Sequence, residues 1–385
     1  MLAIERQLPE VNENHYRTIV TDWFSRWYGH TKEMQTERPV EMKVINAEAS
    51  DEQPRGAADA HLSSPYSGTA ASPSPTFVDL PLGVHLHILS LLDVASICKL
   101  SQTCRYMRGV AGDPLLWNRL LERDLHTWGV VGHRSHPQVY RDAASDLTSK
   151  QIYCYCRLHG AALPHPLDHS LAGRLKSLVR YISGHIPKVL MFGSGLESLP
   201  VVRAMMLDDN SPYRPMGLYP GQDGVGSGMR IHHRDTPVNL VTLYTATRAE
   251  RTAAPTGDTP RVNKLVSYYN QAVDGRPPEL TQAVRTLCQH SDAMILAIDA
   301  NKLDGEALAL DQTILSAMVR WPGDQSPLLV IACSSTPVPA LSPAQVADKL
   351  DLCSLTRPWQ VHSIAMETLT GLEGAFDWLL SKIGH

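Results

Sequence analysis

The sequence predicts a chain with two folded parts, a helical segment followed by a doubly wound α/β domain. Residues 79–128 contain three short segments whose apolar side chains recur at helical spacing. From residue 187 onward, short apolar runs alternate with segments of helical period, which indicates a mostly parallel sheet covered on both faces. Residues 61–76 are rich in Ser, Pro, Gly and Ala and predict a linker that cannot bury enough apolar surface to fold.

Composition limits the possible classes of protein. A length of 385 residues suits two or three domains, and 43% hydrophobic with 19% charged residues is typical of globular proteins. The net charge of −4 argues against nucleic acid or an anionic membrane as a partner. No apolar run reaches the length of a membrane span, and the N-terminus lacks a secretory pattern. Seven cysteines without framework spacing favour reduced thiols, and we expect a cytoplasmic protein that also enters the nucleus.

Residues 10–34 predict a helix with one strongly apolar face, formed by Ile19, Trp23 and Trp27 among others. Side chains of this size on one helix need a partner surface. Two alternatives stay open: the helix packs onto the rest of the same chain, or it joins two copies of the chain. Residues 35–78 are polar and predict a disordered linker.

The segment 79–128 predicts three short helices. Asp79 is expected to cap the first, with Pro81 in its first turn, and Asp93 and Asp113 are expected to begin the second and third. The apolar positions are Val84, Ile88, Leu91 and Leu92 in the first helix, Ile97, Leu100 and Cys104 in the second, and Leu116, Trp117, Leu120 and Leu121 in the third. Helices this short cannot cover all of that surface among themselves, so part of it should remain for a partner protein.

Residues 129–186 predict a mainly helical linker. Within it, Cys154 and Cys156 precede three histidines. The cysteines are one residue apart, where zinc sites usually have two to four, and no second cysteine pair follows. We therefore predict a helix with buried thiols and no metal site.

The domain from residue 187 to 385 predicts alternating strands and helices. The expected strands are 189–192, 229–233, 238–244, 292–300, 327–333 and 359–365. The expected helices are 196–207, 262–273, 280–291, 306–320, 342–350 and 374–383, with a glycine-rich turn at 217–228.

Two runs of this domain, 280–302 and 358–383, resemble small GTPases of the Arf type. The nucleotide-binding positions do not follow that family. At the expected phosphate loop, Gly193 and Gly195 are followed by Leu199 in place of the lysine and Pro200 in place of the magnesium-binding hydroxyl. The γ-phosphate and guanine positions are occupied by 244–248 and 334–337, which lack the required motifs. We therefore expect a GTPase-like domain without nucleotide chemistry.

Two further signals are weak. Gly224, Gly226 and Gly228 precede a strand, whereas a dinucleotide-binding glycine motif follows one and opens a helix. His232, His233 and Asp299 have no nucleophile at a motif position beside them. We expect these histidines and Asp299 to be surface or strand-end residues.

The segment 79–128, with its Leu-Pro entry and its Asp-Pro-Leu-x-Trp third helix, resembles an F-box. With MFGSGLESL, TLYTATRAER and ETLTGLEGAFDWLL, the chain from Tyr16 to Ile383 resembles F-box proteins that carry an atypical GTPase-like domain. The resemblance implies a non-catalytic substrate receptor of an SCF-type (Skp–cullin–F-box) ubiquitin ligase without a cofactor. The F-box residues expected to bind the Skp adaptor are Leu80, Pro81, Ile88, Leu89, Leu92, Ile97, Leu100 and Trp117.

The same resemblance implies protein substrates, a telomeric repeat-binding factor and cyclin D, and a homodimer formed through Ile19, Trp23 and Trp27. It also matches Pro343 and Ala347 to substrate-contacting positions, and Val346 would supply apolar contact beside them. The alternative is that these alanines are inert and that Val346 belongs to the core. The alternative function is a divergent GTPase-like nucleotide switch.

Overall fold

The computed structural model describes residues 77–143, 146–160, 185–207, 211, 213–219, 225–234, 236–245, 264–267, 279–323, 325–336 and 339–383. The predicted dimerisation helix, with Ile19, Trp23 and Trp27, and most of the predicted linker 35–78 lie outside these residues, so both stay predictions. The chain divides into two units between Leu80 and Pro81. The described end of the first unit contains a 3-10 turn, η1 (Phe77–Asp79).

Four helices, not three, follow in the second unit: α2 (Leu82–Leu91), α3 (Val94–Leu100), α4 (Arg105–Val110) and α5 (Pro114–Leu125). The predicted cap at Asp79 is wrong, because Pro81 is the N-cap of α2. The predicted second helix ends early: the Ser101 and Thr103 hydroxyls donate to carbonyls of the preceding turn, which satisfies a helix end. Cys104 therefore lies outside α3 and caps α4 through its sulfur.

The core of this helical unit forms around Trp117 on α5, which is 1% exposed. Its indole Nε1 donates to the Ala111 carbonyl at 2.8 Å, so burial leaves no polar atom unpaired. The Tyr153 ring meets it edge to face at 5.3 Å and the Lys150 ammonium lies 5.2 Å from its centre. Trp117 thus joins α5 to the helix α7 (Ser149–Gly160).

The predicted helical linker contains a strand. β1 (Val130–Gly132) is followed by α6 (Pro137–Asp142) and α7 (Ser149–Gly160). Of the two thiols predicted to be buried, α7 buries Cys156 and leaves Cys154 half-buried. β1 pairs antiparallel with the last strand of the C-terminal domain. The sheet therefore begins before residue 187, and the segment that follows the helical unit shares a hydrogen-bonded strand pair with the α/β domain.

The α/β domain has one eight-stranded sheet in the order β1-β10-β9-β8-β2-β5-β4-β3. Its strands are β2 (Lys188–Phe192), β3 (Tyr213–Tyr219), β4 (Ser227–His233), β5 (Thr236–Thr242), β8 (Ala293–Asp299), β9 (Leu328–Ser334) and β10 (Trp359–Ala365). The five strands from β10 to β5 run parallel, and β4 and β3 continue the sheet antiparallel. A parallel sheet of this order confirms the doubly wound, small-GTPase-like domain.

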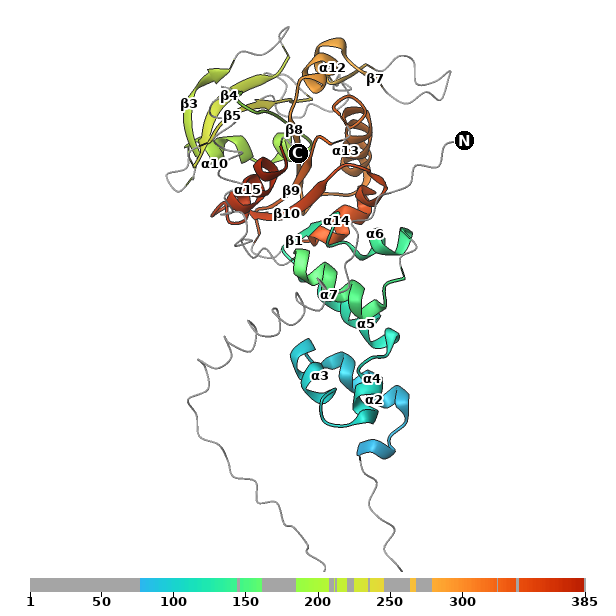
Figure 1. The fold of residues 1–385 in the computed structure, drawn as a ribbon. Coiled ribbons are helices and arrows are strands. Elements are labelled where there is room, and N and C mark those ends of the chain that lie inside the picture. The colour runs from blue at the N-terminus through green and yellow to red at the C-terminus, as the bar shows by residue number, and fades with distance from the viewer. Residues whose placement is uncertain are drawn as a thin grey trace, which may run out of the picture. The chain divides into compact units, whose positions relative to one another are not determined.

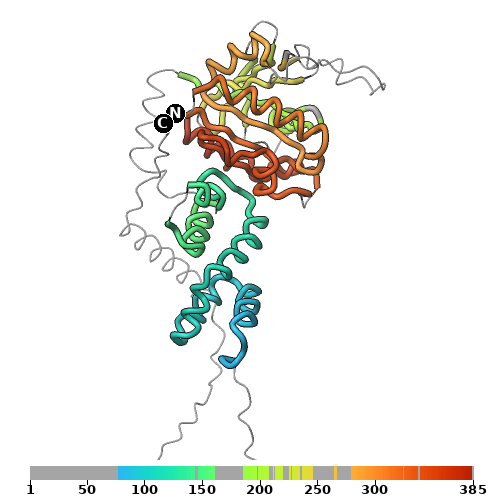
Figure 2. The backbone as a smooth tube through the Cα atoms, turned by 90° about the vertical axis from the view of Figure 1, so that its right-hand side faces the viewer, coloured from blue at the N-terminus to red at the C-terminus, as the bar shows by residue number. Residues whose placement is uncertain are grey.

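Helices cover both faces of the sheet (Figure 1, Figure 2). One face packs against α10 (Val201–Leu207) and α15 (Leu372–Lys382), and the other against α12 (Gln282–Gln289), α13 (Gly305–Met318) and α14 (Pro343–Lys349). This arrangement gives two separate apolar cores, as expected for a sheet that is buried on both sides. None of the described helices is long and apolar enough to cross a membrane.

Three predictions from sequence differ from the structure. The predicted helix 196–207 is broken at Pro200 into α9 (Gly195–Ser198) and α10, because proline removes a backbone donor. The glycine-rich turn 217–228 includes parts of β3 and β4. The predicted helix 262–273 instead contributes β6 (Val266–Ser267), which pairs with β7 (Glu279–Leu280).

We predict that Trp117→Ala lowers the free energy of unfolding of the helical unit by about 3–5 kcal/mol, because a large buried aromatic is lost. Trp117→Phe keeps the contact with Tyr153 but loses the hydrogen bond to Ala111, and should cost less. Urea denaturation of the full chain, followed by far-ultraviolet circular dichroism, measures both. Equal stability of the Ala variant and the wild type would contradict this account of the core.

Candidate functional site

The helical unit places only part of its predicted binding set on the surface. Leu89, Ile97 and Trp117 are at most 1% exposed. Their expected role as surface residues is therefore corrected: they form the core that supports the surface. Among the other predicted residues Pro81 is exposed, and Leu80, Ile88, Leu92 and Leu100 are half-buried.

A different set of large apolar side chains faces solvent on α2, α4 and α5. These are Leu82, Val84, Leu91, Tyr106 and Leu115, with exposed fractions between 40% and 70%. Val84 and Leu91 belong to the predicted apolar positions of the first helix and remain exposed, and the buried side of α2 is formed by His85, Leu86 and Leu89. We call the five exposed residues the apolar surface of the helical unit. These five exposed apolar side chains offer contacts that a protein partner would cover.

The degenerate phosphate loop connects β2 to α9. Gly193 has φ +117°, and a β-carbon there would lie 2.3 Å from the Ala297 carbonyl oxygen. At Gly195 it would lie 2.7 Å from the Ile298 carbonyl carbon. Both glycines are therefore needed for the close approach of the loop to β8. Their presence reflects packing against a strand and does not require a phosphate ligand.

The amide and the hydroxyl of Ser194 in this loop both donate hydrogen bonds to the Asp311 carboxylate of the same chain. The Ser194 amide donates to Asp311 Oδ1 at 2.8 Å, and the Ser194 hydroxyl donates to Oδ2 at 2.5 Å. Asp311 lies on α13 and is fully buried. Burial raises the pKa of Asp311 to about 6, although the two bonds from Ser194 oppose that rise. An internal carboxylate therefore uses the amide at which a nucleotide phosphate would be expected.

The loop at the position of a guanine-binding loop also forms hydrogen bonds within the protein. Ser334 Oγ accepts from the Thr336 amide at 3.1 Å and from Asn301 Nδ2 at 3.2 Å. Asn301 Oδ1 in turn accepts from the Ala340 amide at 3.0 Å. Asp299, at the end of β8, accepts from the Asn301 amide at 3.0 Å. Asp299 is thus a strand-end residue, as predicted, and it stabilises the turn that follows.

Comparison with known proteins finds similarity both to the helical segment and to most of the chain. Residues 77–123 match the family model described as F-box-like. F-box only protein 4 from Bos taurus is 29% identical over 320 residues, covering 79% of this chain and 83% of that protein. F-box only protein 4 from Homo sapiens is 28% identical over 327 residues, covering 80% of this chain and 84% of that protein.

The chain is therefore an F-box-like protein related to F-box only protein 4 over about four fifths of its length. A solved structure of nucleolar GTP-binding protein 1 from Plasmodium falciparum is also similar, with 13% identity and a TM-score of 0.32, covering 51% of this chain and 86% of that chain. The fold of the α/β domain is assigned here from its strand order.

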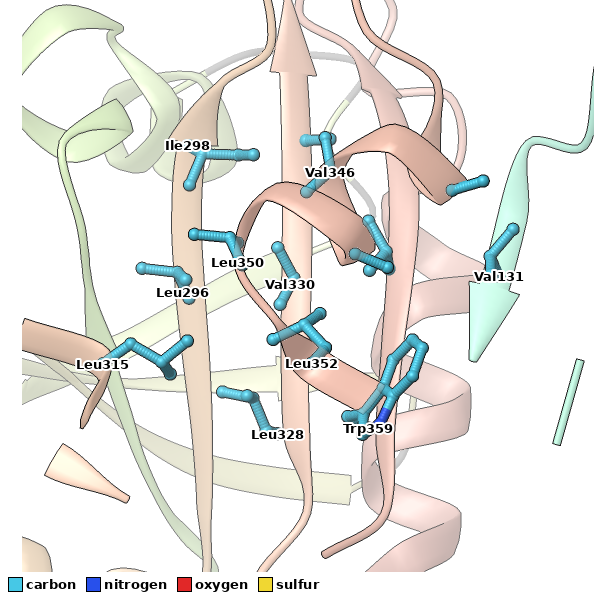
Figure 3. Close-up of a cluster of buried hydrophobic side chains, with 14 of the residues drawn as sticks. Val131, Leu296, Ile298, Leu315, Leu328, Val330, Val346, Leu350, Leu352 and Trp359 are labelled. Atoms are coloured by element: carbon cyan, nitrogen blue, oxygen red, sulfur yellow. The ribbon is translucent and has the colours of Figure 1, made fainter. Parts of the chain in front are cut away.

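In this F-box protein, the predicted substrate-contacting residues are not on the surface. Pro343, Val346 and Ala347 on α14 are buried, and Val346 and Ala347 are 0% exposed. Figure 3 shows Val346 and Leu350 pointing toward Ile298 and Val330 of the sheet. The interpretation of α14 as a docking helix is therefore corrected. Its small residues let the helix lie close to the sheet, and Ala347→Arg would disrupt the fold.

His233 is the last residue of β4, as predicted for a strand-end residue, but it is only 2% exposed, and its Nε2 lies 2.7 Å from Asp377 Oδ1 on α15. His233 therefore joins the β4–β5 hairpin to the last helix, together with Arg234, which pairs with Asp377 and Glu373. Among the described residues, no group of three or more His, Cys, Asp and Glu side chains is placed to hold a metal ion.

We predict that Asp311→Asn changes how stability depends on pH. The pKa of Asp311 is raised in the folded protein, from 3.8 to about 6. Its stabilising contribution is therefore complete below pH 4 and is lost as pH rises through 6. Asn cannot ionise, so its stability relative to the wild type should increase by up to about 3 kcal/mol between pH 4 and pH 7.5.

Urea denaturation at a series of pH values measures this difference. Asp304→Asn, at the N-cap of the same helix, is the control for a general effect of removing one negative charge. A difference between Asp311→Asn and wild type that does not change from pH 4 to pH 7.5 would contradict the prediction.

Proposed function

We propose that this chain is the substrate-recognition subunit of an SCF-type ubiquitin ligase and has no catalytic activity of its own. The apolar surface of the helical unit, within the segment that matches the F-box-like model, carries this proposal. An F-box binds a Skp-type adaptor, which connects it to the cullin scaffold. Such a partner would cover the apolar surface. Full burial of one large apolar side chain favours binding by roughly 1.5–3 kcal/mol of transfer free energy.

The α/β domain is then the part that binds substrates. The Ser194 amide in its phosphate loop donates to Asp311, and Ser334 at the guanine position accepts from Asn301, so the positions of a nucleotide are used for internal contacts. Substrates of the kind expected from the sequence, a telomeric repeat-binding factor and cyclin D, belong to this proposal. So do a homodimer formed through Trp23 and Trp27, and action in the cytoplasm and nucleus.

We predict that Leu91→Ser combined with Leu115→Ser weakens binding of the Skp-type adaptor by about tenfold or more, because two exposed apolar contacts are removed. Neither side chain belongs to the core, so the fold should be retained. Titration of the purified adaptor onto the full chain, measured by calorimetry, gives the affinity.

Leu207→Ser is the matched control, since Leu207 is 72% exposed but lies on α10 of the α/β domain. It should bind the adaptor like the wild type. Wild-type affinity in the Leu91→Ser, Leu115→Ser chain would place the adaptor elsewhere and remove the main support for the proposal.

The alternative function, a GTPase-like switch, makes the opposite prediction about nucleotide. A ligand present at 100 times its dissociation constant adds about 2.7 kcal/mol to the free energy of unfolding. We predict no change in the melting temperature with GTP and magnesium, because Leu199 and Pro200 replace the lysine and the hydroxyl of a phosphate loop. A clear rise in melting temperature with GTP would favour the switch.

A further inference from the structure

One face of the strands β2, β3, β4 and β5 carries two rows of residues in register, and most of their side chains are polar. Residues directly opposite each other in a sheet share a face. The first row runs across four strands and the second across three. The first is Lys188, Asn239, Arg230 and Gly217, and the second is Pro237, His232 and Arg214.

The residues next to the two rows identify the face of the sheet on which the rows lie. The next row along the strands includes Leu190, Val241 and Tyr219, which belong to or pack against the core under α12 and α13. The reverse side of the same strands holds Ile231 and Val238 in the other core, under α10 and α15. The reverse side of these strands is therefore packed against α10 and α15, whereas the two rows lie on the α12 and α13 side of the sheet, next to the core on that side.

Every ionisable side chain in the two rows is basic: Lys188, Arg230, His232 and Arg214. Arg214 and Arg230 are exposed. Arg230 Nε donates to Asn239 Oδ1 at 3.1 Å, which holds its guanidinium along the sheet. The whole chain has a net charge of −4, so this concentration of positive charge runs against the general composition. We call the two rows the basic strand face.

The edge strand of this face, β3, favours a partner that binds through side chains. The register of β3 shifts between Pro215 and Gly217, so Met216 is an extra residue, 60% exposed, beside the two rows. A bulge and a proline without an N–H group both oppose the addition of another strand. A partner at this edge would therefore be bound through side chains: carboxylates to the basic groups and an apolar group to Met216.

We propose that the basic strand face docks an acidic segment of a substrate protein. Its carboxylates would pair with Arg214, Arg230 and Lys188, and one of its large apolar side chains would cover Met216. The inference rests on the proposed function in that it calls the partner a substrate. It also replaces α14, whose small residues are buried, as the docking surface of the domain.

The test uses the full chain with its Skp-type adaptor and a fluorescein-labelled peptide of twelve residues containing six glutamates and two leucines. Fluorescence anisotropy measures its affinity. We expect binding that weakens with added salt and is lost by at least about tenfold in the Arg214→Glu, Arg230→Glu chain. A peptide with lysines in place of the glutamates should bind that variant more tightly than it binds the wild type.

Arg119→Glu combined with Arg203→Glu makes the same change in net charge at exposed positions of α5 and α10, and should leave peptide binding unchanged. Absence of peptide binding, or equal binding to both double variants, would overturn the inference. Tighter binding of a twelve-nucleotide single-stranded DNA, lost in the Arg214→Glu, Arg230→Glu chain, would overturn the assignment to a protein partner. Adaptor affinity, measured in the same samples, tests the proposed function separately.

Discussion

The complete burial of the central strands β8 and β9 is the constraint on which the rest of this domain depends. All seven residues of each strand are buried, so both faces must be covered by helices and both strand ends by closely packed loops. Gly193 and Gly195 lie against the backbone of β8, and Asp299 and Ser334 hold the turns at the strand ends. The loops at this edge are therefore stabilised by contacts within the protein.

Because the loops at the strand ends are held by internal contacts, this GTPase-like fold does not offer them to a nucleotide. In a phosphate-binding loop, free amides receive the ligand. Here the Ser194 amide is bonded to Asp311, a buried carboxylate with a pKa of about 6. The ionised carboxylate is costly to bury, but the two bonds from Ser194 offset part of that cost. The binding functions are left to the surfaces of the chain: the apolar surface of the helical unit and the basic strand face.

Much of this fold could be predicted from the sequence, because apolar runs and helical periods identify buried strands and packed helices. β2, β8, β9 and β10 lie at their predicted places. The period alone did not show which side of α2 faces inward, since Leu82 and Leu91 are as apolar as Leu86 and Leu89. Nor could it show that Ala347 is buried, because alanine suits both a surface and a close helix–sheet contact. The basic strand face depends on register, which only the paired strands reveal.

The strand β1 has a consequence for how the protein can be divided. It comes from the segment between the helical unit and the α/β domain, and it covers the outer edge of β10. Uncovered edge strands are templates for aggregation. A fragment starting at residue 187 would expose the backbone of β10 along the residues paired with Val130, Val131 and Gly132. The smallest soluble piece that contains the α/β domain should therefore begin before β1.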